Sequence, residues 1–485
     1  MQITVEYKVS SLRRQIRELL INEDWQNAII LGDYLISLTP EDPAVYYHMG
    51  LAWLHLYDVD QSEKFLQKAQ ELGDDSAELL LLLGNICAYR GDLNGEFFWA
   101  KKALEREPDN LNAQFVIANS YRSLGQIEES EAAFKEILER NPDNVQARSD
   151  LADIFLSTQR LEESEEQLHE AIKLQPDDGS LYAGLGHVLT RMKREDDALV
   201  AFLTALDLEP DIPVRYYNVG DTYLALENIE KAVLYLRKAS QMAPDNALYH
   251  YDLGLAYFAL KRYDECVRES KGALQNDPEM RFGRTNLGMS ATQNLGIAYM
   301  NLEKYEDAKA CFQRNLALIP STYFNLGLTL FRQQKFEEAL VYFKRAVELV
   351  PDDPEYWDLI GSSYIRLNRF DEAKEVLQKA IQVDDTYALA HHDMGIVIAQ
   401  QPGHEEEAMK SYNRALDLDK NNPYTYYDLC CLYVKQNKKK TAFEYLNMAI
   451  QKGFSDSELI NTDHDLDPIR DDDAFKTIIK KMKKS

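Results

Sequence analysis

Small and large apolar residues recur along this chain with a constant period of 34 residues. Prolines mark the period, because they stand at positions 108, 142, 176, 210, 244 and 278. If each proline is placed at position 32 of a 34-residue unit, position 8 is always small, position 11 is large and apolar, and position 20 is again small. A constant period of this length indicates a repeat solenoid rather than a globular enzyme. The residues at position 8 are Ala118, Ala152, Gly186, Gly220 and Gly254.

Each unit is predicted to form two antiparallel helices. Small residues at positions 8 and 20 let the two backbones approach closely, and large residues at positions 7, 11 and 24 fill the space beside them. Proline at position 32 ends the second helix, since it lacks the N–H that another turn requires. Extended in both directions, the register gives about thirteen units and 26 helices, from a degenerate unit near Ser10 to a last unit near Pro423.

These residues at these spacings resemble the tetratricopeptide repeat (TPR) family over nearly the whole chain. The resemblance implies an all-α fold, a TPR α-solenoid built as a right-handed superhelix of helix-turn-helix repeats. After the last unit, residues 465–472 (DLDPIRDD) with Phe475 look like the closing segment of many bacterial TPR proteins. A terminal repeat would otherwise expose an apolar face, so we expect this segment to be a cap.

The register divides the chain into five segments. Residues 1–42 are an N-terminal segment with the degenerate first repeat, and residues 43–278 are the regular array. Residues 279–353 are irregular repeats, residues 354–454 are C-terminal repeats, and residues 455–485 are the C-terminal cap.

The irregular segment combines an eight-residue insertion with a three-residue deletion. Pro278 and Pro320 lie 42 residues apart, and Pro320 and Pro351 lie only 31 apart. The excess is a doubled phrase, TNLG at 285–288 and QNLG at 293–296. Eight additional helical residues would lengthen one helix by about 12 Å.

Two interpretations of residues 279–325 stay open. The segment is either a hinge or distinct docking surface, or a neutral insertion, since loops absorb insertions at little thermodynamic cost. The same unit carries Asn315 where the pattern places alanine, and residues 401–404 (QPGH) lengthen one later turn by a residue.

Composition excludes several classes of partner. The chain has 54 Lys and Arg against 81 Asp and Glu, a net charge of −27, which argues against nonspecific binding to nucleic acid or anionic lipid.

The N-terminus lacks the apolar core of a signal peptide, and the longest apolar run, residues 79–83, is too short to span a bilayer. The cysteines form no C-x-x-C pair, which fits a reducing compartment. The sequence therefore predicts a soluble, cytoplasmic protein without membrane insertion. The cysteines are Cys87, Cys266, Cys311, Cys430 and Cys431.

No arrangement of residues indicates catalysis or a cofactor. The sequence has no nucleophile–base set, phosphate-binding loop, dinucleotide motif or metal-ligand spacing. Cys430 occupies position 8, where a small residue is required, so packing explains its vicinal pair with Cys431. His391 and His392 are adjacent on a first helix and point about 100° apart. They cannot both bind one metal without a third element, and we expect them to be exposed.

The first helices carry the candidate binding residues. In TPR proteins, first-helix positions 2, 5, 6, 9, 12 and 13 are expected to face the concave groove. After residue 213, positions 5 and 6 often pair an aromatic ring with an amide or carboxylate, which suits an extended peptide. Asn or Asp at position 6 is, however, common in the family whatever is bound. The candidate protein-binding residues are Tyr217, Asn218, Tyr251, Asp252, Asn294, Phe324, Asn325, Asp393, Tyr427 and Asp428.

Basic residues on the same face are few. Position 13 is basic in four units, which is too sparse for a nucleic-acid track. The carboxylate clamp of co-chaperone TPR domains is absent, since no unit of the array has Lys at position 2 or Arg at position 6. A chaperone C-terminal tail is therefore not an expected partner. The basic residues at position 13 are Arg191, Arg332, Arg366 and Lys435.

The sequence predicts a non-catalytic scaffold or adaptor that binds protein or extended peptide segments in the concave groove. The alternative is a structural subunit of a larger multiprotein assembly, held through the convex face or the ends. Large contiguous apolar patches would favour this alternative, because obligate subunits bury such surfaces.

Overall fold

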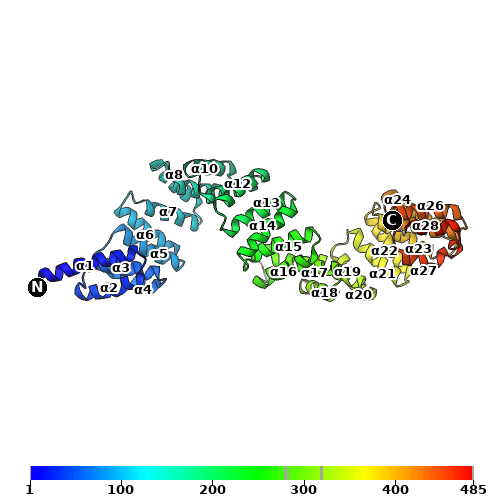
Figure 1. Cartoon of the computed structure of the whole chain (residues 1–485), viewed down its shortest axis with the longest axis horizontal. Helices are drawn as coiled ribbons and strands as arrows, with labels where there is room; N and C mark the ends of the chain where they lie inside the picture. The colour runs from blue at the N-terminus through cyan, green and yellow to red at the C-terminus, as the bar shows by residue number, and fades with distance from the viewer. Residues whose placement is uncertain (1, 278–280, 283–284, 317–319, 483–485) are drawn as a thin grey trace. The chain divides into compact units, whose positions relative to one another are not determined.

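The chain folds almost entirely as α-helices that alternate as first and second helices of thirteen repeats. The computed structural model describes residues 2–277, 281–282, 285–316 and 320–482 (Figure 1). The first helices are α1 (Gln2–Ile21), α3 (Pro43–His55), α5 (Ala77–Tyr89), α7 (Leu111–Ser123), α9 (Val145–Ser157), α11 (Gly179–Arg191), α13 (Pro213–Ala225), α15 (Ala247–Ala259), α17 (Leu287–Asn301), α19 (Pro320–Arg332), α21 (Pro354–Arg366), α23 (Ala388–Ala399) and α25 (Pro423–Lys435). The second helices are α2 (Trp25–Leu38), α4 (Val59–Glu71), α6 (Leu93–Arg106), α8 (Ile127–Arg140), α10 (Leu161–Leu174), α12 (Glu195–Leu208), α14 (Ile229–Met242), α16 (Tyr263–Asn276), α18 (Tyr305–Arg314), α20 (Phe336–Leu349), α22 (Phe370–Val383), α24 (Glu405–Leu418) and α26 (Lys439–Gln451).

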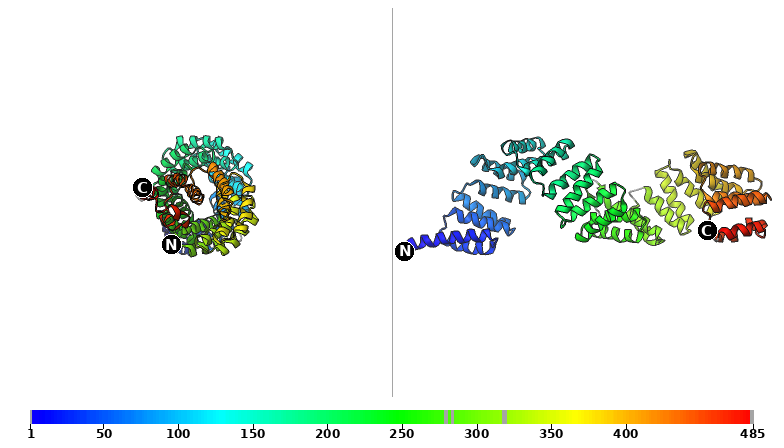
Figure 2. Two further views of the ribbon diagram at one scale, coloured as in Figure 1. Left: turned by 90° about the vertical axis from the view of Figure 1, so that its right-hand side faces the viewer. Right: turned by 45° about the horizontal axis from the view of Figure 1, so that its top comes forward.

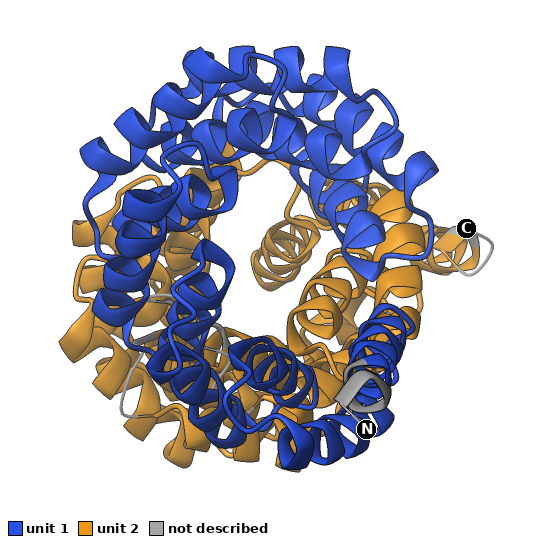
Figure 3. Cartoon of the chain, turned by 90° about the vertical axis from the view of Figure 1, so that its left-hand side faces the viewer, with its two compact units in different colours: residues 1–228 blue, residues 229–485 orange. Residues whose placement is uncertain are grey.

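The chain divides into two compact units. Unit 1 is residues 1–228 and contains α1 to α13, and unit 2 is residues 229–485 and contains α14 onward (Figure 3). Within each unit, the two helices of a repeat lie side by side and stack on the next pair (Figure 2). The site described below belongs to unit 2.

Positions 8 and 20 bring the two helices of a repeat together, as the sequence predicts. Where position 20 is serine, its hydroxyl donates a hydrogen bond to the backbone carbonyl of position 8. The buried pairs are Ser62 with Gly50, Ser130 with Ala118 and Ser164 with Ala152, each 2.7 Å apart. A larger side chain at either position would break this contact.

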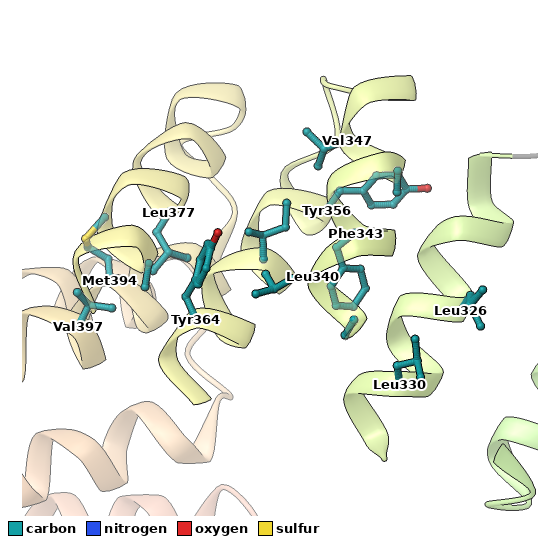
Figure 4. Packing of buried hydrophobic residues seen from close by; sticks show 14 of the residues in the cluster. Leu326, Leu330, Leu340, Phe343, Val347, Tyr356, Tyr364, Leu377, Met394 and Val397 are labelled. Atoms are coloured by element: carbon teal, nitrogen blue, oxygen red, sulfur yellow. The ribbon is translucent and has the colours of Figure 1, made fainter. Parts of the chain in front are cut away.

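The large residue at position 24 fills the space left by glycine at position 8. A Cβ built on Gly327 would lie 2.6 Å from Phe343, whose ring is fully buried, and a Cβ on Gly361 would lie 2.6 Å from Leu377. Phe343 and Leu377 belong to one continuous apolar core that runs from α17 to α25 (Figure 4). The repeats of unit 2 therefore share a core and do not form separate small domains.

Every turn between a first and a second helix passes through one residue in the left-handed conformation. That residue stands at position 15, or one residue later in the turn that contains Gly403. Most of these residues are not glycine, as with Lys261, whose φ is 57°. The amides of Lys261 and Arg262 donate to the carbonyls of Phe258 and Tyr257, each at 2.9 Å, which closes the end of α15 as a Schellman motif. These bonds hold non-glycine residues in a conformation that costs about 1–2 kcal/mol each.

The eight-residue insertion does not lengthen one helix by eight residues. Residues Arg281–Phe282 (β1) and Thr285–Asn286 (β2) form a short antiparallel hairpin, with Arg281 opposite Asn286. Helix α17 has 15 residues, against 13 in the first helices on either side. Backbone pairing between the strands thus takes up most of the excess. Pro278, which marks the period here, lies outside the described residues.

The three-residue deletion precedes Pro320 and does not follow it. Pro320 is the first residue of α19 and opens a new unit, so the distance of 31 residues from Pro320 to Pro351 is regular. The preceding helix α18 has 10 residues, against 14 in α16 and α20. Its end is held by Asn315, whose buried side-chain amide donates to the carbonyl of Met289 at 2.9 Å.

The C-terminal segment packs against the last repeat. It consists of α27 (Ser457–Thr462), the 3₁₀ helix η1 (His464–Ile469) and α28 (Asp473–Met482). Five of its buried apolar side chains, together with Phe454 just before it, form one cluster with α25 and α26, which covers the open end of the array. The five are Ile460, Leu466, Ile469, Phe475 and Ile478.

Replacement of Gly327 by alanine tests the close approach of the helices. We expect Gly327→Ala to lower the stability of unit 2 by about 1–3 kcal/mol, because the added methyl overlaps the immobile ring of Phe343. Thermal and urea denaturation measure the effect. Gly272→Ala in α16 is the control, since its new Cβ meets nothing closer than 3.4 Å and alanine favours a helix. Equal stability of the two variants would contradict the packing.

Replacement of Lys261 by glycine tests the left-handed turn. We expect Lys261→Gly to raise the stability of unit 2 by about 1 kcal/mol, because glycine adopts positive φ without steric cost. The control, Lys410→Gly at an exposed position within α24, should lower stability by a similar amount. A loss of stability in both variants would show that the turn is not left-handed.

Candidate protein-binding face

The first helices α17, α19, α21, α23 and α25 of unit 2 are joined by side-chain contacts, and we call the surface they form the first-helix row. Every neighbouring pair in the row is linked, and the last helix is linked to the cap. The contacts are Thr322 Oγ1 to Gln293 Oε1 (3.2 Å), the stacked rings of Phe324 and Tyr356 (4.6 Å between centroids), Ser362 Oγ to Asp393, Thr425 Oγ1 to His392 Nδ1 (3.0 Å) and Tyr427 OH to Asp463 Oδ2 (2.7 Å). A segment lying along the row would therefore meet consecutive repeats without a break.

Asn294 and Asn325 provide amides for recognition at the start of the row. Both stand at position 6, on α17 and α19, and both are half-buried. Neither side-chain amide forms a hydrogen bond with another residue that the structure describes. Beside them lies Phe324, a half-buried ring stacked on Tyr356. Each amide offers two donors and one acceptor, which matches the polar groups of an extended backbone.

The other aromatic and amide candidates are distributed over both units. Tyr217 and Asn218 lie on α13 in unit 1, where Asn218 is buried with its Nδ2 atom 3.5 Å from Nε2 of His187. Tyr251 and Asp252 lie on α15 in unit 2, where Asp252 is buried and Tyr251 is half-buried. Tyr251 contacts α17, the helix that carries Asn294, through a hydrogen bond with Ser290 and through packing against the cluster that contains Ala291.

Tyr427 is placed inside the fold and not on an open groove. Its side chain is 3% exposed, its ring stacks on Phe454 at 4.5 Å, and its hydroxyl donates to Asp463. Phe454 follows α26, and Asp463 follows α27, so the chain after the last helix pair covers the ring. The repeated positions of the helix pairs do not include these two residues, which is why the sequence pattern alone did not anticipate the contact.

The expectation that His391 and His392 are exposed is wrong. They are 8% and 7% exposed, respectively. His391 Nε2 lies 3.0 Å from the carbonyl of Asp385, and His392 Nδ1 lies 3.0 Å from the hydroxyl of Thr425. Positions 4 and 5 of α23 thus face neighbouring backbone and α25. Burial lowers the pKa of His392, so the ring is neutral at neutral pH.

Three carboxylates from consecutive first helices act on one another through their charges, since burial and the charge of Asp393 together raise the pKa of both Asp358 and Asp428, and we call Asp358, Asp393 and Asp428 the acidic cluster. His392 Nε2 lies 3.9 Å from Asp393 Oδ1 and 3.6 Å from Asp428 Oδ2, and Asp393 accepts a hydrogen bond from Ser362. Burial raises the pKa of all three carboxyl groups, that of Asp428 to about 8. Asp358 was missed from the sequence, because Leu359 follows it at position 6 and breaks the ring–amide pattern.

Metal ligands, thiols and membrane-spanning helices are the other features of interest in the described residues. Their His, Cys, Asp and Glu side chains form no group of three placed to hold a metal ion. Burial raises the pKa of Cys311 to about 11 and of Cys430 to about 12, so both thiols are poor nucleophiles at neutral pH. No described helix is both long enough and apolar enough to cross a membrane.

Comparison with solved structures gives repeat proteins of low overall similarity. The crystal structure of MamA is 24% identical over 33% of this chain and 94% of that chain, with a TM-score of 0.32. The APC/C hetero-tetramer Cut9-Hcn1 is 13% identical over 99% of both chains, with a TM-score of 0.40. TTC0263, a thermophilic TPR protein of Thermus thermophilus, is 21% identical over 38% of this chain and 100% of its own, with a TM-score of 0.33. No curated protein matches the sequence.

Sequence profiles of one family match separate stretches on both sides of the irregular segment. Profiles described as tetratricopeptide repeat or TPR repeat match residues 122–187, 220–261, 290–322, 320–353, 354–387 and 397–422. Two of these stretches, 320–353 and 354–387, coincide with the helix pairs α19–α20 and α21–α22, and the helix-turn-helix repeats form the α-solenoid that this family implies. The chain belongs to the tetratricopeptide repeat family.

Proposed function

We propose that this chain is a non-catalytic scaffold that binds an extended segment of a partner protein along the first-helix row of unit 2. The observation that carries the proposal is the pair of half-buried amides of Asn294 and Asn325, which have no hydrogen-bond partner among the described residues. Half-buried amides on adjacent repeats are suited to backbone groups of a bound segment. A cytoplasmic location is part of the proposal and rests on the irregular spacing of the cysteines.

The row supplies both polar and apolar recognition. The amides of Asn294 and Asn325 can pair with N–H and C=O groups of the segment, each bond contributing about 0.5–1.5 kcal/mol. The ring of Phe324 can cover an apolar side chain between them. Because consecutive helices are linked, side chains of one segment can be read by several repeats in turn.

The alternative is a structural subunit held through the convex face or the ends, and attachment through the second helices would need a contiguous apolar surface on them. Among the described residues, the large apolar side chains of second helices that are at least half exposed lie on repeats that are not neighbours within either unit. Isolated apolar residues of this kind are normal on a protein surface. We therefore favour the scaffold. These side chains are Ile30, Phe98 and Val200 in unit 1 and Leu234 and Val341 in unit 2.

The double variant Asn294→Ala/Asn325→Ala tests the proposal. We expect it to weaken capture of the partner from a native lysate by about tenfold or more, because each lost amide leaves a partner group unpaired at about 1–3 kcal/mol. Neither amide has a hydrogen bond to lose within the described fold, so stability should stay unchanged. Quantitative pull-down with mass spectrometry measures the captured protein.

The matched control is Asn413→Ala/Asn447→Ala, which removes two amides from the second helices α24 and α26. Its capture should equal that of the wild type. Undiminished capture by Asn294→Ala/Asn325→Ala would contradict binding at the first-helix row, and equal losses in both double variants would contradict the preference for first helices.

A further inference from the structure

The acidic cluster lies within the first-helix row and is short of positive charge. Asp358 stands on α21, Asp393 on α23 and Asp428 on α25, so three consecutive repeats each contribute one carboxylate. The side chains of Asp393 and Asp428 are 13% and 27% exposed, and each has an oxygen within 4 Å of the ring of His392. Solvent therefore reaches the cluster from the side of Asp428.

Asp358 is the member of the cluster that the fold leaves unsatisfied. It is 4% exposed, and its Oδ1 atom has no hydrogen-bond partner in the described part of the chain. Ser362 lies one helical turn after Asp358 on the same side of α21, and its hydroxyl binds Asp393. Asp358 thus faces α23. The charge of Asp358 also acts on Tyr387 at the start of α23, whose pKa it raises together with burial.

The groups that surround the cluster are mostly acidic. The charge of Glu355 raises the pKa of Asp358, and those of Asp463 and Asp465 raise the pKa of Asp428. The opposing cations are Arg366, which acts on Asp393, and Lys435, which acts on Asp428. Lys435 is already engaged, because its Nζ atom lies 2.8 Å from Asp465. Two phenols, Tyr387 and Tyr412, also face these acids, and burial raises the pKa of both, so they stay neutral.

Burying a carboxylate costs free energy unless a cation or hydrogen-bond donors compensate for it. The cluster gathers three such groups, two of them beside one neutral imidazole, and one oxygen of Asp358 lacks a donor among the described residues. An arginine side chain offers five N–H donors in a rigid plane and keeps its charge when buried, which matches several acceptors at once.

We propose that the acidic cluster binds an arginine side chain, or less tightly a lysine, of the partner segment that lies along the first-helix row. This inference rests on the function proposed above and names the chemistry of the partner. The arginine enters beside Asp428, bridges Asp428 and Asp393, and donates to Asp358 at the inner end. The amides of Asn294 and Asn325 then hold the segment further along the row.

Selection of displayed random 12-residue peptides on the full chain tests the inference. We expect the recovered peptides to contain arginine or lysine, and a synthetic peptide of the consensus to bind in solution. Its twin with glutamine in place of the cationic residue should bind roughly 10- to 100-fold more weakly, because hydrogen bonds to charged groups are the strong ones. Isothermal titration calorimetry measures both peptides.

The matching protein variant is Asp358→Asn/Asp393→Asn. It should weaken the binding of the cationic peptide by a similar factor and leave the binding of the glutamine twin unchanged. The control is Asp150→Asn, which removes one carboxylate at position 6 of α9 in unit 1 and outside the cluster. If the double variant fails to fold, the wild-type comparison of the two peptides still decides the result.

The pH dependence gives a signature of the cluster itself. Asp428 has a raised pKa of about 8 in the free chain, so a bound cation must displace its proton. Affinity for the cationic peptide should therefore rise as pH increases from 6 to about 8 and level off above the pKa. Proton release, read from titrations in buffers of different ionisation enthalpy, should fall in Asp428→Asn.

The outcomes separate this inference from the function on which it rests. Suppose that the recovered peptides bind Asn294→Ala/Asn325→Ala more weakly than the wild type. If these peptides carry no cation, or bind Asp358→Asn/Asp393→Asn as tightly as the wild type, the cation site is overturned and the scaffold function stands. If no recovered peptide needs Asn294 and Asn325 for binding, the proposed function is overturned, whatever the acidic cluster binds.

Discussion

The close approach of the two helices within each repeat is the constraint on which the rest of this structure depends. A small residue at position 8 brings the backbone of the first helix against the second, and the serines at position 20 bond directly across that contact. Glycine at position 8 also leaves the space that Phe343 or Leu377 fills from position 24. Because every pair is closed in this way, successive first helices present equivalent positions toward their neighbours. The surface of unit 2 follows from this regularity, since Ser362, Asp393, His392 and Thr425 connect three repeats only when their helices keep register.

The same regularity explains how a solenoid can be specific for a bound segment. Each repeat places a few side chains on the first-helix row, and their chemistry changes along it. Amides and rings from α17 to α21 suit a backbone and an apolar side chain, whereas the carboxylates from α21 to α25 suit a cation. A buried, incompletely paired acid such as Asp358 lowers the stability of the free chain. A partner that supplies the missing hydrogen-bond donor would offset this cost.

Much of the fold could be predicted from the sequence, because the packing of a repeat depends on a few residues at a fixed spacing. Small residues at positions 8 and 20 and large residues at positions 11 and 24 predicted the helix pairs and the contacts within them. Three features could not be predicted. The left-handed residue of each turn is often Lys, Glu or Gln, so composition does not reveal it. Residues 281–282 and 285–286 form strands, although the phrase at 285–288 repeats a helical one. The burial of His391, His392 and Tyr427 depends on contacts outside their own helices, with Asp385, Thr425 and Phe454 respectively, and the period of one helix does not reveal them. The candidate residues at position 6 were found, but Asp358 emerged only from its burial.

Hydroxyl-radical footprinting of the chain with and without a captured partner tests the central claim most directly, because it reports the exposure of individual side chains. The account predicts that the partner protects half-buried side chains of α17, α19 and α21, Phe324 among them, and leaves Val341 and Leu234 on the second helices as reactive as before. Protection of Val341 and Leu234, with the first-helix row unchanged, would show that this protein binds through its second helices and would contradict the account.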